Sequence, residues 1–198
     1  APEKTLISLD DLKGHFHFHT VLSDGHNTLE QMVSAASKLK FTHFVVCDHS
    51  RSAAYAGGLT EYKIEQQKAE VAGLQEKGFK IFRGIESDIL RTGELDYPEE
   101  ILKEFALIVA SVHSATSLDE SEMTARMIKA IENPYTDILA HPTGRILLKR
   151  EAYAVDIKKV IDACAANGVA IEINANPKRL DLDWRHIEYA RNKGTLFA

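Results

Sequence analysis

The sequence predicts one α/β domain folded as a seven-stranded (β/α) barrel. Short runs of β-branched and aromatic residues alternate with longer amphipathic stretches along the chain, which is typical of parallel strands joined by crossover helices. Strands buried behind such helices build either a doubly wound sheet or a barrel. Seven strand candidates fit within 198 residues, and no glycine-rich phosphate loop follows the first of them. Those two observations favour the barrel.

The strand candidates are short apolar runs, and most of them end next to a polar residue. In chain order they are 16–19, 43–47, 80–85, 107–112, 137–141, 170–173 and a seventh that begins at Thr195.

The helix candidates between these strands carry start and stop signals. They span 29–39, 61–77, 120–131, 157–167 and 184–192. Thr28 and Thr60 stand directly before the first two, where an N-cap hydroxyl is expected. Glycine follows three of the helices, at the position where a left-handed residue commonly ends a helix: Gly78, Gly168 and Gly194.

The overall charge gives no sign of a polyanionic partner. The chain has 24 Lys and Arg against 29 Asp and Glu, a formal net charge of −5, so any nucleic acid must be held locally. No apolar run approaches the roughly 20 residues that a membrane span needs. Residues 1–11 have no signal-peptide pattern, so we expect no membrane partner and a cytoplasmic location.

The cysteines and the ends of the chain lead to two further expectations. Cys47 and Cys164 lie in apolar stretches without CxxC spacing, which favours buried free thiols. We expect residues 1–12 to be a linker or an N-terminal extension, and residues 13–198 to form the domain.

Metal-ligand side chains recur at the ends of the predicted strands. Residues at the carboxyl ends of barrel strands converge on one mouth, and a two-residue period points His17 and His19 to the same face. Asp24, in the turn Ser23-Asp24-Gly25, is close enough to join them. The side chains expected to meet are His17, His19, Asp24, His49, Glu86, His113 and His141.

These ligands indicate more than one metal ion. Imidazole and carboxylate groups suit Zn²⁺, Mn²⁺ and Fe²⁺, and five histidines with two carboxylates exceed the ligands of one four-coordinate ion. A carboxylate such as Glu86 can bridge two ions, an arrangement that polarises a phosphoryl oxygen while activating a water. We therefore give Glu86 the catalytic role of bridging the metals.

The alternative is that these histidines are ordinary polar residues. A single histidine after a strand is more often hydrogen-bonded than metal-bound. Six ligand positions on five successive strands are hard to explain as independent events, so we favour the metal site. The other histidines are expected to be non-ligands: His15, His26, His43 and His186.

Several short motifs resemble the PHP (polymerase and histidinol phosphatase) family of metal-dependent phosphoesterases. The opening match consists of His17-Phe18-His19-Thr20, Ser23-Asp24-Gly25 and Cys47-Asp48-His49-Ser50. It continues with Gly84-Ile85-Glu86-Ser87-Asp88, Ala110-Ser111-Val112-His113-Ser114, His141-Pro142-Thr143-Gly144-Arg145 and Glu172-Ile173-Asn174-Ala175-Asn176-Pro177. The last four motifs, with Ile131-Glu132-Asn133-Pro134, are most similar to the C-terminal PHP domain of bacterial family X DNA polymerases.

The resemblance implies a distorted, TIM-like (β/α)7 barrel and up to three divalent ions. His17, His19 and Glu86 would hold the first ion. Glu86, His113 and His141 would hold the second, and Asp24 and His49 the third.

This chain departs from the family pattern at two places. His15 stands where an acidic residue is common, and the family's closing Asp-x-His pair has no counterpart before Ala198. We therefore expect the domain to be truncated at its C-terminal end, and the third ion to have too few ligands for tight binding.

Arginines near the strand ends are candidate phosphate ligands, because a planar guanidinium suits bidentate contact with a phosphate. We assign substrate binding to Arg51, Arg145 and Arg179. Three further cations add local positive charge near the same rim: Lys149, Arg150 and Lys178.

The favoured function is a divalent-metal phosphoesterase. The resemblance implies a 3′–5′ exonuclease or 3′-end processing domain in DNA repair, acting on DNA 3′ ends and covalently linked to an upstream polymerase domain. One alternative is a small-metabolite phosphatase of the histidinol phosphatase type, acting on a phosphomonoester. The other is a non-catalytic domain that supports a polymerase, which the complete set of visible ligands disfavours.

Overall fold

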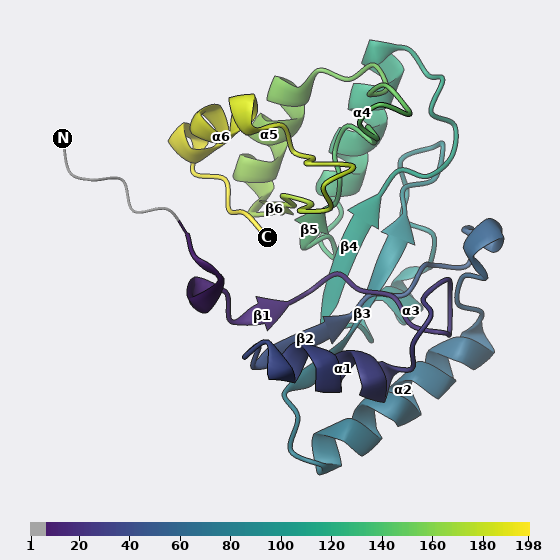
Figure 1. Ribbon diagram of the computed structural model, residues 1–198. Helices are drawn as coiled ribbons and strands as arrows, with labels where there is room; N and C mark the ends of the chain where they lie inside the picture. Colours follow the sequence, from purple (N-terminus) through teal and green to yellow (C-terminus); the bar gives the residue numbers. More distant parts are fainter. Residues whose placement is uncertain (1–6) are drawn as a thin grey trace.

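Six parallel strands pair in chain order and form one curled sheet (Figure 1). The computed structural model describes residues 7–198. The strands are β1 (Gly14–His15), β2 (His43–Val46), β3 (Ile81–Asp88), β4 (Leu107–Ser111), β5 (Ile138–Leu139) and β6 (Ala170–Ile171). Because each strand pairs only with its sequence neighbours, the described sheet is a half-barrel with β1 and β6 at its two edges.

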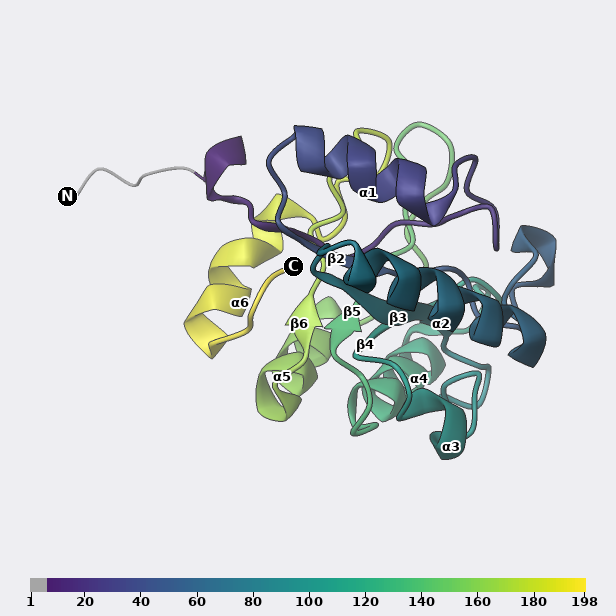
Figure 2. The ribbon, with the colours of Figure 1, turned by 90° about the horizontal axis from the view of Figure 1, so that it is seen from below.

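Helices cover the outside of this sheet, as the view from below shows (Figure 2). They are α1 (Leu29–Lys38), α2 (Glu61–Glu76), α3 (Glu99–Leu102), α4 (Glu120–Ile131), α5 (Ile157–Asn167) and α6 (Ile187–Lys193). Short 3-10 turns occur at η1 (Leu9–Asp11), η2 (Ala54–Ala56) and η3 (Trp184–His186). None of the described helices is both long and apolar enough to cross a bilayer.

The predicted capping residues occupy the predicted places. The Thr28 and Thr60 side chains accept hydrogen bonds from the backbone N–H groups of Gln31 and Lys63. Gly168 and Gly194 end α5 and α6 in the left-handed conformation, with φ of 70° and 83°. Local sequence therefore sets the limits of most helices.

The predicted first strand, 16–19, is wrong in its position. Pairing of β1 with β2 ends at His15, and beyond it one backbone hydrogen bond, from Cys47 N to Phe18 O (3.0 Å), holds the segment beside β2. The segment is extended, but it is tied too sparsely to form a ladder.

The predicted seventh strand is reduced to a single bridge between Phe197 and Ile171. Three backbone hydrogen bonds of 2.8 to 3.1 Å tie residues 196–198 alongside β6. The other differences from the prediction include η3, which precedes α6 so that this helix begins at Ile187, and the short helix α3, which was not predicted.

Two large apolar clusters lie on the outer side of the sheet and a small one lies on its inner side. The outer clusters pack against α1 and α2 at one end, and against α4, α5 and α6 at the other. The inner cluster consists of Val45, Cys47, Val109, Ile138 and Ala140. Alternation along β2 explains this division, because Phe44 and Val46 belong to an outer cluster while Val45 and Cys47 point inward. Both cysteines are buried free thiols, as predicted.

The absence of a side chain at Gly84 on β3 allows the inner cluster to pack tightly. A Cβ at this position would lie 2.6 Å from Val45 Cγ1 and 2.8 Å from Cys47 Sγ. Glu86 follows two residues later and therefore points to the same inner side.

We expect Gly84→Ala to destabilise the protein by about 1–3 kcal/mol, because the added methyl overpacks the inner cluster. Gly73→Ala is the matched control, since a Cβ there meets nothing within 4 Å. It should stabilise α2 by about 0.5–1 kcal/mol. Urea denaturation of the metal-free chain measures both, and a neutral Gly84→Ala would contradict this packing argument.

Candidate metal centre

One buried carboxylate lies at the centre of the predicted ligands. Glu86 is 1% exposed, and an imidazole nitrogen of each of five histidines lies within 3.5 Å of its two oxygens. The distances to Oε1 are 3.3 Å from His17 Nε2, 3.4 Å from His113 Nε2 and 3.0 Å from His141 Nε2. Those to Oε2 are 3.5 Å from His19 Nε2 and 2.9 Å from His49 Nδ1.

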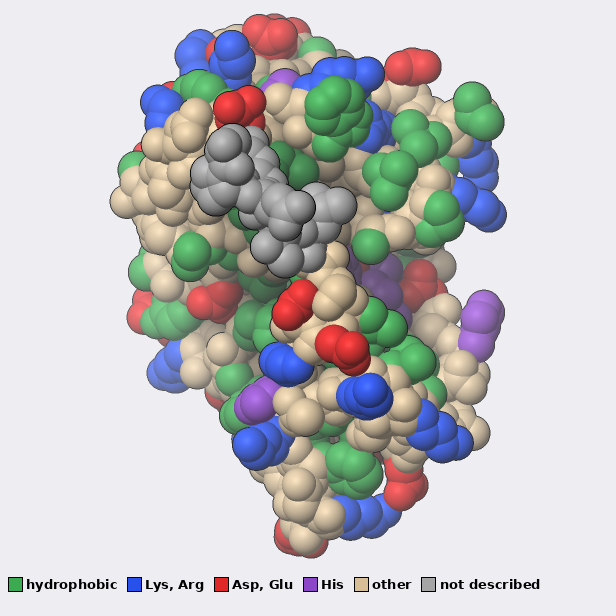
Figure 3. All heavy atoms as spheres, turned by 60° about the vertical axis from the view of Figure 1, so that its left-hand side comes forward, with side chains coloured by type: hydrophobic (Ala, Val, Ile, Leu, Met, Phe, Trp, Pro, Cys, Tyr) green, Lys and Arg blue, Asp and Glu red, His purple; other side chains and the backbone are tan. Residues whose placement is uncertain are grey.

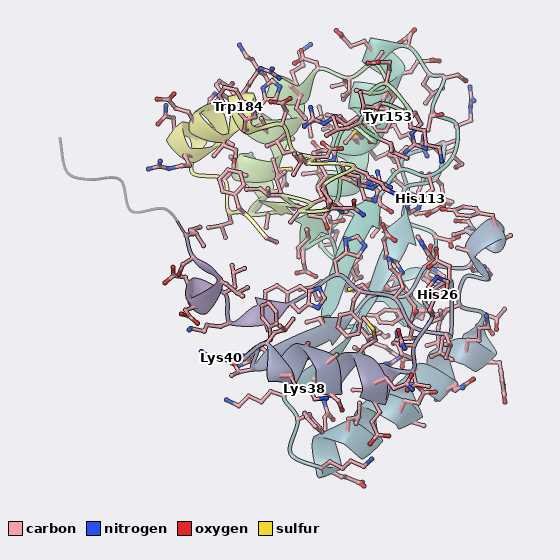
Figure 4. All side chains as sticks on the ribbon, viewed as in Figure 1. His26, Lys38, Lys40, His113, Tyr153 and Trp184 are labelled. Atoms are coloured by element: carbon pink, nitrogen blue, oxygen red, sulfur yellow. The ribbon has the colours of Figure 1, made fainter. Side chains whose placement is uncertain are left out.

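Glu86 and the five histidines lie on, or follow, five successive strands. His17 and His19 follow β1, His49 follows β2, His113 follows β4 (Figure 4) and His141 follows β5. Glu86 lies inside β3, which runs to Asp88, three residues past the predicted end. The strand is longer because β3 stays paired with β4 and also bridges His49.

Asp24 completes the set from a more exposed position. Its carboxylate oxygens lie 3.7 Å from His19 Nδ1 and 3.4 Å from His49 Nε2, and its side chain is 48% exposed. The structure thus brings all seven predicted ligands together. Among the described residues, ligand atoms gather into three overlapping groups: His17, His19 and Glu86; His19, Asp24 and His49; and His49, Glu86 and His113.

The polar atoms of this cluster fit metal ions. Glu86 Oε2, His19 Nδ1, His49 Nδ1 and His141 Nδ1 are buried and make no hydrogen bond, even though Glu86 Oε2 and His49 Nδ1 lie 2.9 Å apart. A buried acceptor without a partner is costly in a folded protein. Cations placed among these atoms would satisfy them, and the mixture of imidazole and carboxylate suits first-row divalent ions.

A second layer of carboxylates orients the ligands. Glu172 Oε1 lies 2.5 Å from His17 Nδ1, while its Oε2 accepts from the His141 backbone N–H at 2.8 Å. Asp88 Oδ1 lies 2.6 Å from His113 Nδ1. The two contacts at Nδ1 bind the far side of the His17 and His113 rings, which leaves Nε2 of each ring to face Glu86.

A third supporting carboxylate, Asp48, holds the turn that carries Asp24. It is fully buried and accepts from Thr20 N at 2.7 Å, Thr20 Oγ1 at 2.9 Å and Ser23 Oγ at 2.7 Å. These three hydrogen bonds therefore fix the conformation of the turn between His19 and Asp24.

Sequence reasoning did not assign roles to these three carboxylates, although signals for two of them were present. Asp88 lies two residues after Glu86 and so shares its face of β3. Glu172 follows β6 just as the histidines follow the other strands. No comparable spacing singles out Asp48.

Burial and neighbouring charges have opposing effects on the pKa values of the ligand side chains. Burial alone would lower the pKa of His17, but the charge of Glu86 and the hydrogen bond to Glu172 raise it to about 10. Burial likewise opposes the hydrogen bond to Asp88, which raises the pKa of His113 to about 9. Burial, helped by the charges of His17 and His49, lowers the pKa of His19 to about 4. The pKa of Glu86 stays well below its usual range despite burial, because His17, His113 and His141 surround it.

The three predicted phosphate-binding arginines lie in different surroundings. Arg179 lines the cavity above the metal centre, and its Nη1 is buried without a partner. Arg145 donates to Arg179 O, Leu180 O and Asp183 Oδ2, so its guanidinium holds the neighbouring loop. Arg51 is exposed, with its guanidinium 5.7 Å from the centre of the Tyr97 ring.

The histidines set aside as non-ligands stay outside the cluster. His15 stacks on Phe18 and Phe41, with ring centres 5.2 and 5.7 Å apart. None of the four belongs to the ligand groups found among the described residues.

The metal centre opens into a cavity of about 460 Å³. Figure 3 shows histidine and acidic side chains in a recess of the surface. Beside the predicted ligands and Arg179, the wall contains Asn174 and Asn176. Tyr55, on η2, lies beside the ligand cluster, with its ring centre 6.1 Å from that of His49 and 6.2 Å from that of His113. Burial and the charges of Asp88 and Glu86 raise the pKa of Tyr55 to about 12, so its hydroxyl remains a donor.

Comparison with known proteins gives one family and two kinds of relative. The PHP domain family matches residues 15–176. "DNA polymerase/3′-5′ exonuclease PolX" of Bacillus subtilis is 37% identical over 195 residues, which is 98% of this chain and 34% of that protein. A "Probable phosphatase" of Thermoanaerobacter sp. is 34% identical over 167 residues, 80% of this chain and 62% of that protein.

The chain thus spans about a third of the length of the first relative and about three-fifths of the second. Among solved structures, histidinol phosphate phosphatase from Lactococcus lactis, complexed with zinc, L-histidinol and phosphate, superposes with a TM-score of 0.55. The match is 15% identical and covers 93% of this chain and 95% of that one, which shows a shared fold.

We expect metal binding at neutral pH to release about two protons. The raised pKa values of His17 and His113 keep both rings protonated in the metal-free chain at pH 7, so an ion at Nε2 displaces a proton from each. Affinity should therefore rise with pH up to about the pKa of His17, most steeply below that of His113. Calorimetric titration with Zn²⁺ in buffers of different ionisation enthalpy counts the protons, and a count near zero would contradict this charge state.

Glu172→Ala should lower metal affinity by roughly 10- to 100-fold, because it removes the group that orients His17 and His141. Glu151→Ala, an exposed carboxylate on a nearby loop, should leave affinity unchanged. Equilibrium dialysis against Mn²⁺ compares them, with thermal melting of the metal-free chains as the check on folding. Equal affinities in two folded variants would show that Glu172 does not support the metal ligands.

Proposed function

Because this chain belongs to the PHP domain family, we propose that it is a divalent-metal phosphoesterase whose active site is the cluster around Glu86. The observation that carries the proposal is the meeting of five imidazoles on one buried carboxylate that has an oxygen without a hydrogen-bond partner. A purely structural polar cluster would be expected to satisfy its own acceptors.

Two of the proposed ligand sets fall within groups of the cluster, and the other takes His141, whose Nε2 lies 3.0 Å from Glu86 Oε1, in place of His49. His17, His19 and Glu86 hold one ion, while Glu86, His113 and His141 hold a second. Asp24 and His49 hold a third, weaker ion, because His19 beside them also serves the first and Asp24 is half exposed. Mn²⁺, Zn²⁺ or Fe²⁺ suit these ligands, and such ions, when bound, polarise phosphoryl oxygens and activate water.

The chain's own side chains supply position and charge. Glu172 and Asp88 hold the rings of His17 and His113 with Nε2 toward Glu86. Arg179 binds a phosphate oxygen through its unpartnered Nη1, which lies at the wall of the cavity. Tyr55 donates its hydroxyl hydrogen to the substrate at the mouth, where its raised pKa keeps it protonated.

The preferred substrate is the 3′ end of DNA, cleaved in the 3′–5′ direction during repair. Support comes from the PolX relative, which matches nearly the whole of this chain, and from the open mouth beside Arg179. In this proposal a polymerase domain is covalently linked, since the relative is about three times as long as the match. Residues 196–198, which already run beside β6, belong to the seventh strand of a distorted barrel.

A small phosphomonoester is the second candidate. The relatives named as probable phosphatases support it, and so does the volume of the cavity, about 460 Å³. That volume is within the range of small-molecule sites.

The metal-loaded chain should degrade a 3′-labelled oligonucleotide with a higher kcat/KM than it shows for p-nitrophenyl phosphate. Glu86→Ala should cost more than roughly 100-fold, beyond the usual loss from a supporting residue, and more than His49→Ala, because Glu86 faces all five histidines. His26→Ala, an exposed histidine outside the cluster, is the control and should keep full activity.

Two results would change the proposed function. A higher kcat/KM for the monoester would establish the phosphatase alternative. A chain that takes up metal and cleaves neither substrate would refute the phosphoesterase and favour the supporting domain.

A further inference from the structure

Two loops beside the cavity form a joined surface. One spans residues 144–150 and the other 176–186, and they run side by side in both ribbon views (Figures 1 and 2). Leu147 N donates to Lys178 O at 2.7 Å, and Arg145 crosses from the first loop to Arg179 O at 3.0 Å. The loops therefore act as one unit, which we call the double loop.

Trp184 stands at the end of the double loop in an unusual position. It is the only tryptophan in the sequence, yet 72% of it is exposed, and Figure 4 shows it at the outer edge beside α6. The Arg185 guanidinium lies 5.2 Å from the centre of its ring. Asp183 accepts from Arg145 Nη1 at 2.5 Å and from Arg185 Nη1 at 2.9 Å. The indole is thus held at the surface by a charged network.

The charge of the double loop is positive where solvent reaches it. Lys149, Arg150, Lys178 and Arg185 are exposed. The two carboxylates of the second loop, Asp181 and Asp183, are buried and bind within the protein, at Thr143 N and at Arg145. Glu151 and Glu188 border the surface. A chain with a net charge of −5 therefore presents a local cationic face next to its cavity.

The same two loops also expose apolar side chains. Leu147, Leu148 and Leu180 are 39%, 109% and 49% exposed. In Figure 3, apolar and basic side chains occur together at the upper right of the molecule. A surface that mixes flat or apolar contacts with positive charge suits single-stranded nucleic acid, whose bases and phosphates alternate in the same way.

The double loop leads directly into the metal centre. Arg179 belongs to it and also lines the cavity, with Nη1 buried and unpartnered. A strand whose terminal phosphodiester reached the metal centre would pass Arg179 and continue along the cations toward Trp184. A small phosphomonoester would fill the cavity and leave Trp184 untouched.

We propose that the double loop is a platform for single-stranded nucleic acid, on which Trp184 stacks a base upstream of the 3′-terminal nucleotide. Lys149, Lys178 and Arg185 contact the phosphates between that base and the cavity. The proposal rests on the phosphoesterase function only in placing the 3′ end at the metal centre. Because every base has a stacking face, the platform accepts strands without regard to sequence.

The fluorescence of Trp184 tests the platform without any catalysis. Oligo(dT), added to the metal-free chain, should quench the emission to saturation, whereas inorganic phosphate and thymidine monophosphate should not. Raising the salt concentration should weaken binding, with a slope of about −0.7 for each phosphate contact. Lys149→Ala with Lys178→Ala should make that slope shallower by about two contacts' worth.

A pair of aromatic variants separates the platform from the active site. Trp184→Ala should weaken binding of labelled oligo(dT) by roughly 5- to 150-fold, the loss of one stacked base, and Trp184→Phe should recover most of it. Tyr62→Ala is the matched control, since Tyr62 is 80% exposed on α2, and it should bind like the parent. With metal, Trp184→Ala should hydrolyse bis(p-nitrophenyl) phosphate at the parent rate while losing activity on oligonucleotides.

Each contrary result has a distinct meaning. Unchanged emission with oligo(dT), or unchanged binding by a folded Trp184→Ala, would overturn the platform. The same holds if Trp184→Ala only altered self-association, which would make the exposed indole a protein interface. If the parent chain bound oligo(dT) through Trp184 but hydrolysed no phosphoester, the platform would stand and the proposed function would fall.

Discussion

The buried charge of Glu86 is the constraint on which the rest of the structure depends. An ionised carboxylate removed from water is stable only when donors or opposite charges surround it. This one is 1% exposed and faces five imidazoles. Those rings come from four separate segments, so the strands must end at a common level. Any shift of one strand along the sheet would withdraw a ring from the carboxylate.

Small residues on the inner side of the sheet, next to Glu86, make this convergence possible. Gly84, Cys47 and Ala140 present little or no side-chain bulk on the inner side of the sheet, which allows β2 and β3 to approach closely. Pairing then continues past the end of β2, where Glu86 N donates to Asp48 O at 3.0 Å and Ser50 N donates to Glu86 O at 2.9 Å. His141 adopts a φ of 27° at the end of β5, a conformation that costs a non-glycine residue free energy and is found most often at functional sites.

The carboxylates at the ligand cluster and those on the double loop have different surroundings. At the cluster, Glu172, Asp88 and Glu86 contact the imidazoles. Outside it, on the double loop, Asp181 and Asp183 are turned inward and the cations remain on the surface. A cluster of imidazoles and carboxylates therefore lies beside a rim of exposed Lys and Arg, although the net charge of the chain is negative.

The sequence by itself determined the parallel α/β architecture, most helix limits and the side chains that meet around Glu86. Hydrophobic period, capping residues such as Thr28 and Gly168, and the position of histidines after strands are all local properties. The tertiary structure alone decided that β1 ends at His15 and that Arg145 binds the neighbouring loop while Arg179 lines the cavity. It also decided that Asp48 supports the Asp24 turn. These outcomes depend on which distant groups come within hydrogen-bond distance, and a one-dimensional pattern carries no information about distances between segments far apart in the chain.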